Sequence, residues 1–310
     1  MEQEAHGSKH PTDIDGEIDL KEIFNVLFQG KWIIISVTTF ISIIGVVYSL
    51  SLPNIYTSKA LLVPVDSSSS FSGKLGGGYT GLAGLPGINL TSGSNSSNSI
   101  KALEKITSLS LFENNILTNI FLPDLMAIKS WNSQTNTIIY DESIYKVDTN
   151  TWIDGFYPSA QKSFREFENH LDVNLNRESG FITLTIKHQS PFIAKQWSEL
   201  IINEVNAFYR QKDRSESERA VNYLNQQISI TSLSEIKQVL AQLLQEQIKK
   251  LTLIEANESY VFDYIDPPAV MEKKSEPRRA YICIVIAIFG GMMSVFLVFI
   301  RHYFLKEKVS

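Results

Sequence analysis

Two runs of uncharged, apolar residues limit what this chain can fold into more than any other feature. Residues 32–52 and 280–300 are each 21 residues long and contain no Asp, Glu, Lys or Arg. At about 1.5 Å per residue, a helix of this length is about 31 Å long, which matches the ~30 Å hydrocarbon core of a bilayer. A buried helix of a soluble protein rarely stays uncharged over such a length. The sequence therefore predicts two transmembrane helices with a large segment between them.

The residues before the first run argue against a cleaved signal peptide. Residues 1–31 hold seven acidic residues against three lysines, whereas the n-region of a signal peptide is short and basic. We therefore expect an uncleaved anchor, with cytoplasmic tails over 1–31 and 301–310 and with the segment 53–279 in the periplasm. Basic residues outside the two runs favour this orientation: Lys21, Lys31, Arg301, Lys306 and Lys308. Four others, on the inner side of the second run, weaken the preference: Lys273, Lys274, Arg278 and Arg279.

Composition and motifs argue against several classes of function. The net charge of −5 gives no basic excess for binding nucleic acid. The single cysteine, Cys283, excludes an intramolecular disulfide, and the five histidines lack the spacing of metal ligands. Gly73-Lys74 is followed by Leu75, so it does not form a phosphate-binding loop. We expect no metal, no cofactor and no catalytic site, and therefore not an enzyme.

The segment 53–279 begins and ends with predicted strands. Residues 56–65 and 260–265 have strand composition, and 170–175 and 181–187 alternate with a period of two around the turn sequence NRESG, which predicts a hairpin. Apolar positions at helical spacing predict a helix over 99–120. Residues 66–99 hold ten serines and eight glycines, which favours a flexible loop. The expected fold is an α+β domain with a mixed sheet as its base.

Residues 192–257 predict a long helical hairpin, which we name the rod. No glycine or proline occurs in this segment. A helix of about 36 residues should end at a tight turn near 229–232, and a helix of about 24 residues should return; one uninterrupted helix is the alternative. Ser232 and Glu235 have the spacing of a capping box.

The rod also carries two apolar stripes at helical spacing. A long amphipathic rod needs a cover for its apolar face, and neighbouring copies of the chain would supply one. The charged residues 211–220 are interpreted as a solvated helix surface, and a belt of ion pairs between subunits is the alternative. The candidates for the seam between copies are Trp197, Ile201, Val205, Phe208, Leu240 and Leu243.

Residues 131–158 are rich in aromatic and amide side chains. Such side chains can bind a sugar, since aromatic faces flanked by polar groups suit carbohydrate. The interpretation we favour is that these rings pack the base of the domain or lie near lipid headgroups.

Pairs of small residues four positions apart occur in both apolar runs. Such pairs let helix backbones approach closely. We therefore predict that the second span contacts the first, or the second span of a neighbouring copy. The pairs are Gly45 with Ser49, Ala287 with Gly291, and Gly290 with Ser294.

Residues 266–279, DPPAVMEKKSEPRR, form a proline-rich and basic collar before the second run. Proline fixes the backbone, and the basic side chains suit lipid headgroups. With two terminal spans, an α/β base and a rod, this collar resembles that of the bacterial chain-length determinant (Wzz-type) family, the polysaccharide co-polymerases of O-antigen lipopolysaccharide. The positions in register with the family motif are Pro268, Pro277, Arg278 (in place of Lys), Gly290 and Met292; Met271, Glu276 and Ser294 depart from it.

The resemblance implies a non-enzymatic regulator of O-antigen chain length, located in the bacterial inner membrane with its bulk in the periplasm. It implies a ring of identical subunits, the O-antigen polymerase as partner, and lipid-linked polysaccharide as a further candidate partner. The alternative is a periplasmic-rod membrane adaptor, or a co-polymerase of capsule or exopolysaccharide export that works with a separate kinase. Tails of 31 and 10 residues are too short for a kinase or a sensor output domain.

Overall fold

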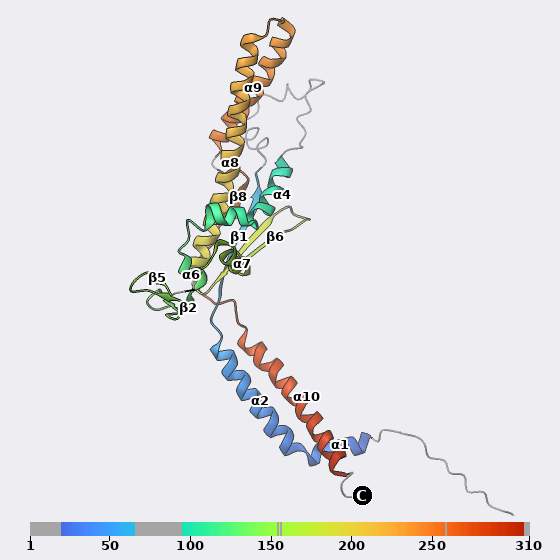
Figure 1. Cartoon of the computed structure of the whole chain (residues 1–310). Helices are drawn as coiled ribbons and strands as arrows, with labels where there is room; N and C mark the ends of the chain where they lie inside the picture. The colour runs from blue at the N-terminus through green and yellow to red at the C-terminus, as the bar shows by residue number, and fades with distance from the viewer. Residues whose placement is uncertain (1–19, 66–94, 154, 156, 258, 307–310) are drawn as a thin grey trace, which may run out of the picture. The chain divides into compact units, whose positions relative to one another are not determined.

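The computed structural model describes residues 20–65, 95–153, 155, 157–257 and 259–306, and it divides into two compact units (Figure 1). One unit comprises Met1–Leu52 and Pro277–Ser310, and the other comprises Pro53–Glu276. Most of the predicted Gly/Ser loop, residues 66–94, lies outside the described residues. The helix α4 begins at Asn95, so the last five residues of that predicted loop are helical.

Over its described residues, the first unit is built from three helices: α1 (Leu20–Gln29), α2 (Lys31–Ser51) and α10 (Arg279–Lys306). Both α2 and the part of α10 from Arg279 to His302 are long and apolar enough to cross a membrane. The predicted spans are thus confirmed as helices, with starts one residue earlier than predicted. Within the residues predicted to be tails, α1 forms before the first span, and α10 continues past residue 300 to Lys306.

The second unit has a four-stranded sheet with the order β6 (Leu171–Leu175), β7 (Ile182–His188), β1 (Tyr56–Pro64) and β8 (Phe262–Asp266). The predicted hairpin is the pair β6 and β7, and the two predicted end strands are β1 and β8, which lie side by side. The α+β class is confirmed. The sheet is not mixed, however: every pairing is antiparallel, because β6 returns directly into β7 and both neighbours of β1 run against it.

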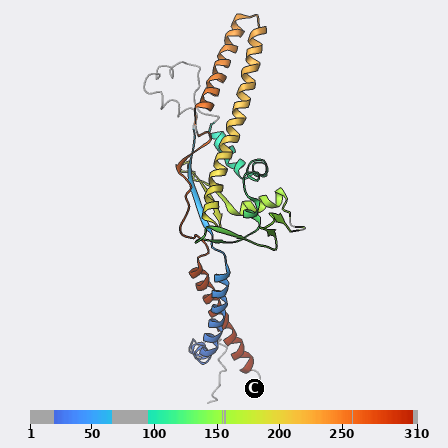
Figure 2. The ribbon, with the colours of Figure 1, turned by 90° about the vertical axis from the view of Figure 1, so that its left-hand side faces the viewer.

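One face of this sheet is covered by α8 (Pro191–Ile230), which packs against β1 and β7 (Figure 2). Alternate residues of β1, Ser58, Ala60 and Leu62, are buried, as expected for a strand with one covered face. The largest fully buried side chains of the core come from α8 and from the helices and strands around it: Trp197, Phe112, Phe167 and Phe262. The core therefore lies between the sheet and the lower part of α8.

The helix predicted over 99–120 is broken into shorter pieces. These are α4 (Asn95–Ile106), α5 (Leu109–Leu111) and the π-helical turn η1 (Phe112–Ile116), followed by α6 (Leu122–Met126). The break occurs at Ser108, which has an extended backbone and whose side chain accepts a hydrogen bond from the backbone amide of Leu111. A serine in this conformation caps a new helix instead of continuing the old one. A further helix, α7 (Ala160–His170), precedes β6.

The rod is a helical hairpin, as predicted, made of 40 residues of α8 and 23 residues of α9 (Ser234–Ala256). Residues 231–233 form the turn. The capping-box prediction was wrong. Because Leu233 is extended and immediately precedes α9, Leu233 and not Ser232 occupies the cap position, and no side chain caps the helix there.

Two small hairpins were not predicted. One joins β2 (Ile128–Asn132) to β3 (Thr137–Tyr140), and the other joins β4 (Tyr145–Lys146) to β5 (Thr151–Trp152). The positive φ angles of Asn136 and Asn150, a conformation that asparagine tolerates well, allow the two tight turns. Residues 131–152 of the predicted aromatic segment therefore belong to two hairpins and the link between them.

Candidate functional site

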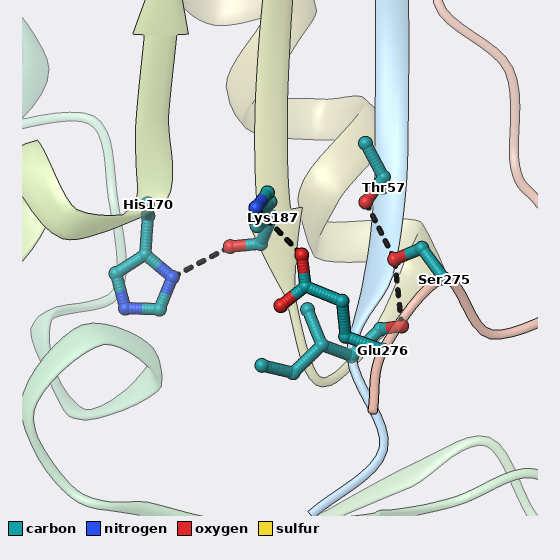
Figure 3. Close-up of polar contacts among 6 residues, drawn as sticks. Thr57, His170, Lys187, Ser275 and Glu276 are labelled. Atoms are coloured by element: carbon teal, nitrogen blue, oxygen red, sulfur yellow. Dashed lines mark hydrogen bonds and ion pairs between the residues drawn. The ribbon is translucent and has the colours of Figure 1, made fainter. Parts of the chain in front are cut away.

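The collar is attached to the start of β1 by backbone hydrogen bonds (Figure 3). Ile55 and Glu276 pair as an antiparallel bridge, in which the amide of Ile55 donates to the carbonyl of Glu276 at 2.9 Å. The amide of Ser275 donates to the carbonyl of Ile55 at 2.8 Å, and the hydroxyls of Ser275 and Thr57 lie 2.6 Å apart. These hydrogen bonds thus hold the first residues of the Pro53–Glu276 unit against its last residues.

A second set of contacts joins the collar to β7. The ammonium group of Lys187 lies 2.7 Å from a carboxylate oxygen of Glu276, and the backbone carbonyl of Lys187 is 2.6 Å from Nδ1 of His170. Figure 3 shows these groups side by side across the strands. Both side chains of the ion pair are partly exposed, so the pair contributes at most about 1 kcal/mol, and its main effect is to fix the register of the collar.

The prolines and basic residues of the collar take different positions. Pro268 is buried, and the next carbonyl, that of Ala269, accepts a hydrogen bond from the buried hydroxyl of Ser58 at 3.2 Å. Pro277 is half-buried and Arg278 is exposed, both directly before α10. The structure thus gives Pro268 a packing role, whereas Arg278 has its charged group available to solvent or lipid headgroups.

The two membrane helices pack in opposite directions along their whole length. A Cβ atom placed on Gly45 would lie 2.7 Å from a methyl carbon of Ile286, and one placed on Gly290 would lie 3.0 Å from a methyl carbon of Ile41. The distance at Gly45 is shorter than real Cβ contacts, and the distance at Gly290 is tighter than most of them, so a larger residue at either position would require the facing isoleucine to shift. The predicted contact between the first and second spans is therefore confirmed within one chain.

Polar groups and the helix ends add to this packing. The hydroxyls of Thr38 and Ser294 lie 3.2 Å apart within the helix pair. The guanidinium of Arg279 donates to the carbonyl of Leu52, the C-cap residue of α2, at 3.4 Å. A cation at the C-terminus of a helix is favourable because the last carbonyls carry partial negative charge. Ser294 departs from the family motif. Its hydroxyl contacts that of Thr38, and a glycine at this position could not make the same contact.

Two other small or motif residues of α10 point away from α2. A Cβ atom placed on Gly291 would have no other atom within 4 Å, and Met292 is 64% exposed. Gly291 therefore makes no close contact with α2. The motif residues Gly290 and Met292 thus lie on different faces of α10, and only Gly290 faces α2.

Three of the seam candidates are buried inside the chain's own base. Trp197, Ile201 and Val205 are fully covered in the core. The Trp197 ring lies 4.9 Å from that of His188 and 5.8 Å from that of Phe167. We expected this stripe to be shared between copies. The sheet and α7 cover it instead, so these three side chains have no surface left for a neighbour.

The other candidates lie higher on the rod or at its edge. Leu240 is half-buried and belongs to the line of α9 that packs on α8, together with Leu244, Leu251 and Ile254. Leu243 is 44% exposed and belongs to an outer line with Ile236 and Val239. The predicted stripe thus combined two faces of α9. Phe208 is half-buried, and the ammonium group of Lys105 lies 4.6 Å from the centre of its ring.

The sequence did not predict the buried polar contacts at the foot of the rod. Asp213 was assigned to a solvated charged surface, yet it is buried and accepts a hydrogen bond from the Tyr260 hydroxyl at 2.5 Å. Burial and the neighbouring carboxylate raise the pKa of Tyr260 well above its usual range. Position 213 follows the buried positions 201, 205 and 209 at four-residue intervals. This spacing could have indicated from the sequence that Asp213 is buried.

A side-chain amide of α8 binds the backbone of the edge strand β8 and the residue before it. The carbonyl oxygen of Asn206 accepts from the amides of Val261 and Phe262 at 2.8 and 2.9 Å, and its amide nitrogen donates to the carbonyl of Phe262 at 2.9 Å. Asn206 therefore pairs with this edge much as another strand would.

His188 is a buried histidine of the base whose pKa is lowered. Its Nδ1 accepts from the amide of Ser190 and its Nε2 donates to the carbonyl of Asp124, both at 3.0 Å. Burial lowers the pKa of His188 from 6.5 to about 4, so the imidazole is neutral at neutral pH. Burial raises the pKa of the nearby Asp124 carboxyl, although the hydrogen bond from Tyr140 opposes this effect. These groups are enclosed, and they stabilise the base rather than form an open site.

The aromatic rings of Trp131, Tyr140, Tyr145 and Trp152 contact one another or other rings of the base. The Trp131 ring lies 5.2 Å from that of Tyr56 on β1 and 6.3 Å from that of Phe192 on α8. The Tyr145 ring lies 5.2 Å from that of Trp152. These contacts favour the packing interpretation of the segment over a sugar-binding one. Within the described residues, no group of three or more His, Cys, Asp and Glu side chains could hold a metal ion.

Comparison with known proteins gives a family match over part of the chain. Residues 16–117, about a third of the sequence, match the family model described as "Wzz: Chain length determinant protein". A comparison with curated proteins returned no match.

Two solved structures are similar to the chain. One is a "full-length bacterial polysaccharide co-polymerase", 15% identical, with 93% of this chain and 99% of that chain covered and a TM-score of 0.42. The other is a "Fragment of WzzB, Polysaccharide Co-polymerase from Salmonella Typhimurium", 13% identical, with 72% and 100% covered and a TM-score of 0.33. The match over residues 16–117, which includes α2 and β1, supports a relationship of the chain to the Wzz-type chain length determinant proteins.

Proposed function

We propose that this protein is a non-enzymatic regulator of polysaccharide chain length, and that its substrate system is the O-antigen of lipopolysaccharide. The observation that carries the proposal is the family match over residues 16–117. The two apolar helices support a location in the inner membrane. The contacts of the described titratable residues support a structural role for them: His188, Asp124 and Asp213 are all enclosed.

The Pro53–Glu276 unit is proposed to lie in the periplasm, with both tails in the cytoplasm. The basic residues outside the spans support this orientation. A reporter that is active only in the periplasm should be silent when fused after Ser310 and active when inserted in the 66–94 segment. The reverse pattern would contradict the orientation.

The protein is further proposed to act as a homo-oligomer together with a separate polysaccharide polymerase. Support comes from the outer line of α9, because Ile236, Val239 and Leu243 are exposed in the single chain. Contiguous exposed apolar side chains on a soluble surface usually mark an interface. In this proposal the outer line of α9, rather than Trp197, Ile201 and Val205, faces the neighbouring copy.

Deletion of the gene provides the test. We expect that the banded length distribution of the cell's lipopolysaccharide on a gel changes to an unregulated ladder, and that the gene on a plasmid restores the bands. Loss of all polymer would contradict a regulatory role and indicate a polymerase or exporter. If the deletion changes only the capsule or exopolysaccharide, that polymer and not the O-antigen is the one regulated. This result would support the alternative of a co-polymerase that works with a separate kinase.

A further inference from the structure

The helix before the first membrane span has three distinct faces. In α1, Val26 is buried, and Gly30, four residues later, lies so close to Val298 of α10 that a Cβ atom there would be 2.5 Å from its methyl carbon. Residues four apart share one face of a helix. Val26 and Gly30 therefore define the face of α1 that packs against α10.

The other two faces are exposed, and they differ in chemistry. Phe24 is 72% exposed and Phe28, four residues later, is 63% exposed. Asn25 and Gln29 form the corresponding polar pair and are also exposed. Each helical residue advances by about 100°, so the aromatic pair and the polar pair occupy adjacent faces of one short helix. An aromatic face that the described residues leave largely exposed, with a polar face beside it, is typical of a helix at a membrane surface.

The position of α1 places these faces at one end of the membrane helices. Only Gly30 separates α1 from α2, and the hydrogen bond from the Gly30 amide to the carbonyl of Val26 closes the last turn of α1. In Figure 1, α1 runs across the lower end of α10, and in Figure 2 the same helix is seen nearly end-on. It therefore lies across the axis of α2 rather than continuing it.

The residues next to Phe28 have the chemistry of a lipid interface. The ammonium group of Lys31 lies 4.4 Å from the centre of the Phe28 ring, and Trp32, the second residue of α2, is 72% exposed. Tryptophan and basic side chains are enriched at the headgroup level, where the apolar part contacts acyl chains and the polar part reaches water. Arg301 of α10 is a further exposed basic residue in the same unit.

We propose that α1 is an interfacial helix that docks on the bilayer itself. Phe24, Phe28 and Trp32 insert between the lipid headgroups and the acyl chains on the side where α2 begins, and Asn25 and Gln29 face water. The bilayer is the assigned partner because the aromatic face continues directly into the apolar surface of a spanning helix. Its effect is to fix the depth and the rotation of the pair α2 and α10 in the membrane.

The test uses the full-length protein with Cys283→Ser as background. Single cysteines at positions 24, 25, 28 and 29 carry an environment-sensitive NBD fluorophore, in vesicles of phosphatidylethanolamine and phosphatidylglycerol. We expect the labels at 24 and 28 to be quenched several-fold more by lipids spin-labelled near the headgroup than by aqueous iodide. The labels at 25 and 29 should show the opposite preference. All four sites belong to one helix, so each polar site is the control for its aromatic neighbour.

Two results would overturn the proposal. If iodide quenches all four labels equally, the aromatic face is in water. If both quenchers fail to quench the labels at 24 and 28, and this protection appears only at high protein density, a second copy of the protein covers the face instead of lipid.

Hydrogen–deuterium exchange of unlabelled protein removes any effect of the label. The double variant Phe24→Ser, Phe28→Ser should raise exchange across residues 20–29 about tenfold, while Asn25→Ser, Gln29→Ser should leave it unchanged. Both variants should still resist extraction from the membrane by carbonate, since α2 and α10 are intact. Equal exchange in the two double variants would show that the aromatic face does not hold α1 on the bilayer. This outcome is independent of any change in polysaccharide length.

Discussion

The two halves of α8 follow the same helical spacing but have different surroundings. In the lower half, Trp197, Ile201 and Val205 are enclosed by the sheet and the helices of the base. In the upper half the stripe continues through Asp213, Ser217 and Leu224, and α9 is the main element beside it. Periodicity thus identifies which face of a helix is covered, but the element that covers it depends on the rest of the fold. We expect the lower half to govern folding and the upper half to govern assembly.

The largest effect should follow from Trp197→Ala in the lower half. Removing a fully buried tryptophan leaves a cavity and typically lowers the free energy of unfolding by about 3–5 kcal/mol. Chemical denaturation of the full chain in detergent, followed by circular dichroism, measures this loss. Leu243→Ala, on the outer line of α9 beside the upper half of α8, is the control and should change the free energy of unfolding far less. Equal losses in the two variants would remove the distinction between the halves.

Acid should also act on the lower half, through His188. Because the pKa of His188 falls from 6.5 in the unfolded chain to about 4 in the folded one, the unfolded state binds more protons between these pH values. The contribution of the neutral imidazole is complete above pH 6.5 and is lost as the pH falls toward 4, by about 3 kcal/mol in total. Denaturation at several pH values measures this slope. His188→Gln should flatten it, and an unchanged slope would mean that other groups cause it.

In the membrane helices, a covered face and an open face can be compared at two consecutive residues of α10, Gly290 and Gly291. Gly290→Leu should force α2 and α10 apart at Ile41, and overpacking of this kind typically costs about 1–3 kcal/mol. Gly291→Leu, directed into open space, is the matched control. We expect lower yields of crosslinks between cysteines at positions 38 and 294, and impaired length control, with Gly290→Leu alone. Both variants should still insert into the membrane. Normal crosslinking and length control in Gly290→Leu would dismiss the packing role.

A smaller effect on stability, but a clear one on assembly, is expected from Leu243→Lys. The side chain is 44% exposed in the single chain, so a lysine there can keep its charge in water and the chain should fold normally. If copies meet at the outer line of α9, the charge becomes buried and unpaired, which is unfavourable. Crosslinked oligomers should decrease, and the polysaccharide should be shorter or more broadly distributed. Unchanged oligomers and sugar lengths would place the interface elsewhere. Leu240→Lys, on the line that packs on α8, should also destabilise the hairpin.

The smallest effect is expected from Arg214→Ala in the upper half. The guanidinium contacts Glu218 at 2.9 Å and Glu255 at 3.1 Å, but all three side chains are exposed. Exposed ion pairs of this kind contribute little to stability. The denaturation midpoint and the oligomer yield should match those of the parent protein. A clear loss of oligomers would instead make Arg214 part of the contact between copies.

Much of the architecture could be predicted because it depends on local pattern. The spans, the β6–β7 hairpin and the rod all follow from hydrophobic periodicity and from the absence of glycine and proline over 192–257. The break at Ser108 could not be predicted, since the same serine is compatible with an exposed helix position. The hairpins at 128–152 were missed because their strands are only two to five residues long.

The candidate site was predicted less well than the fold, for a physical reason. The collar prolines and the small residues of the spans could be identified from residue type, and the structure gives Pro268, Gly45 and Gly290 definite neighbours. The seam required knowledge of which apolar face remains uncovered after folding. Trp197 and Leu243 look alike in a stripe, but one lies over the sheet and the other on the outer side of a two-helix hairpin. Only tertiary structure separates them.

The sheet order has a consequence for how the chain is made. The strand β1 is synthesised first, yet its two neighbours are β7 and β8. The first of these follows only after α4 to α7, and the second only after the whole rod. At a synthesis rate of about 5–20 residues per second, β1 waits on the order of ten seconds for its partners. During that time its apolar residues, including Ala60 and Leu62, have no native cover. The rod hairpin, whose contacts are local, can form before β1 has these neighbours. We therefore expect the pairing of β8 with β1 to be a late step of folding.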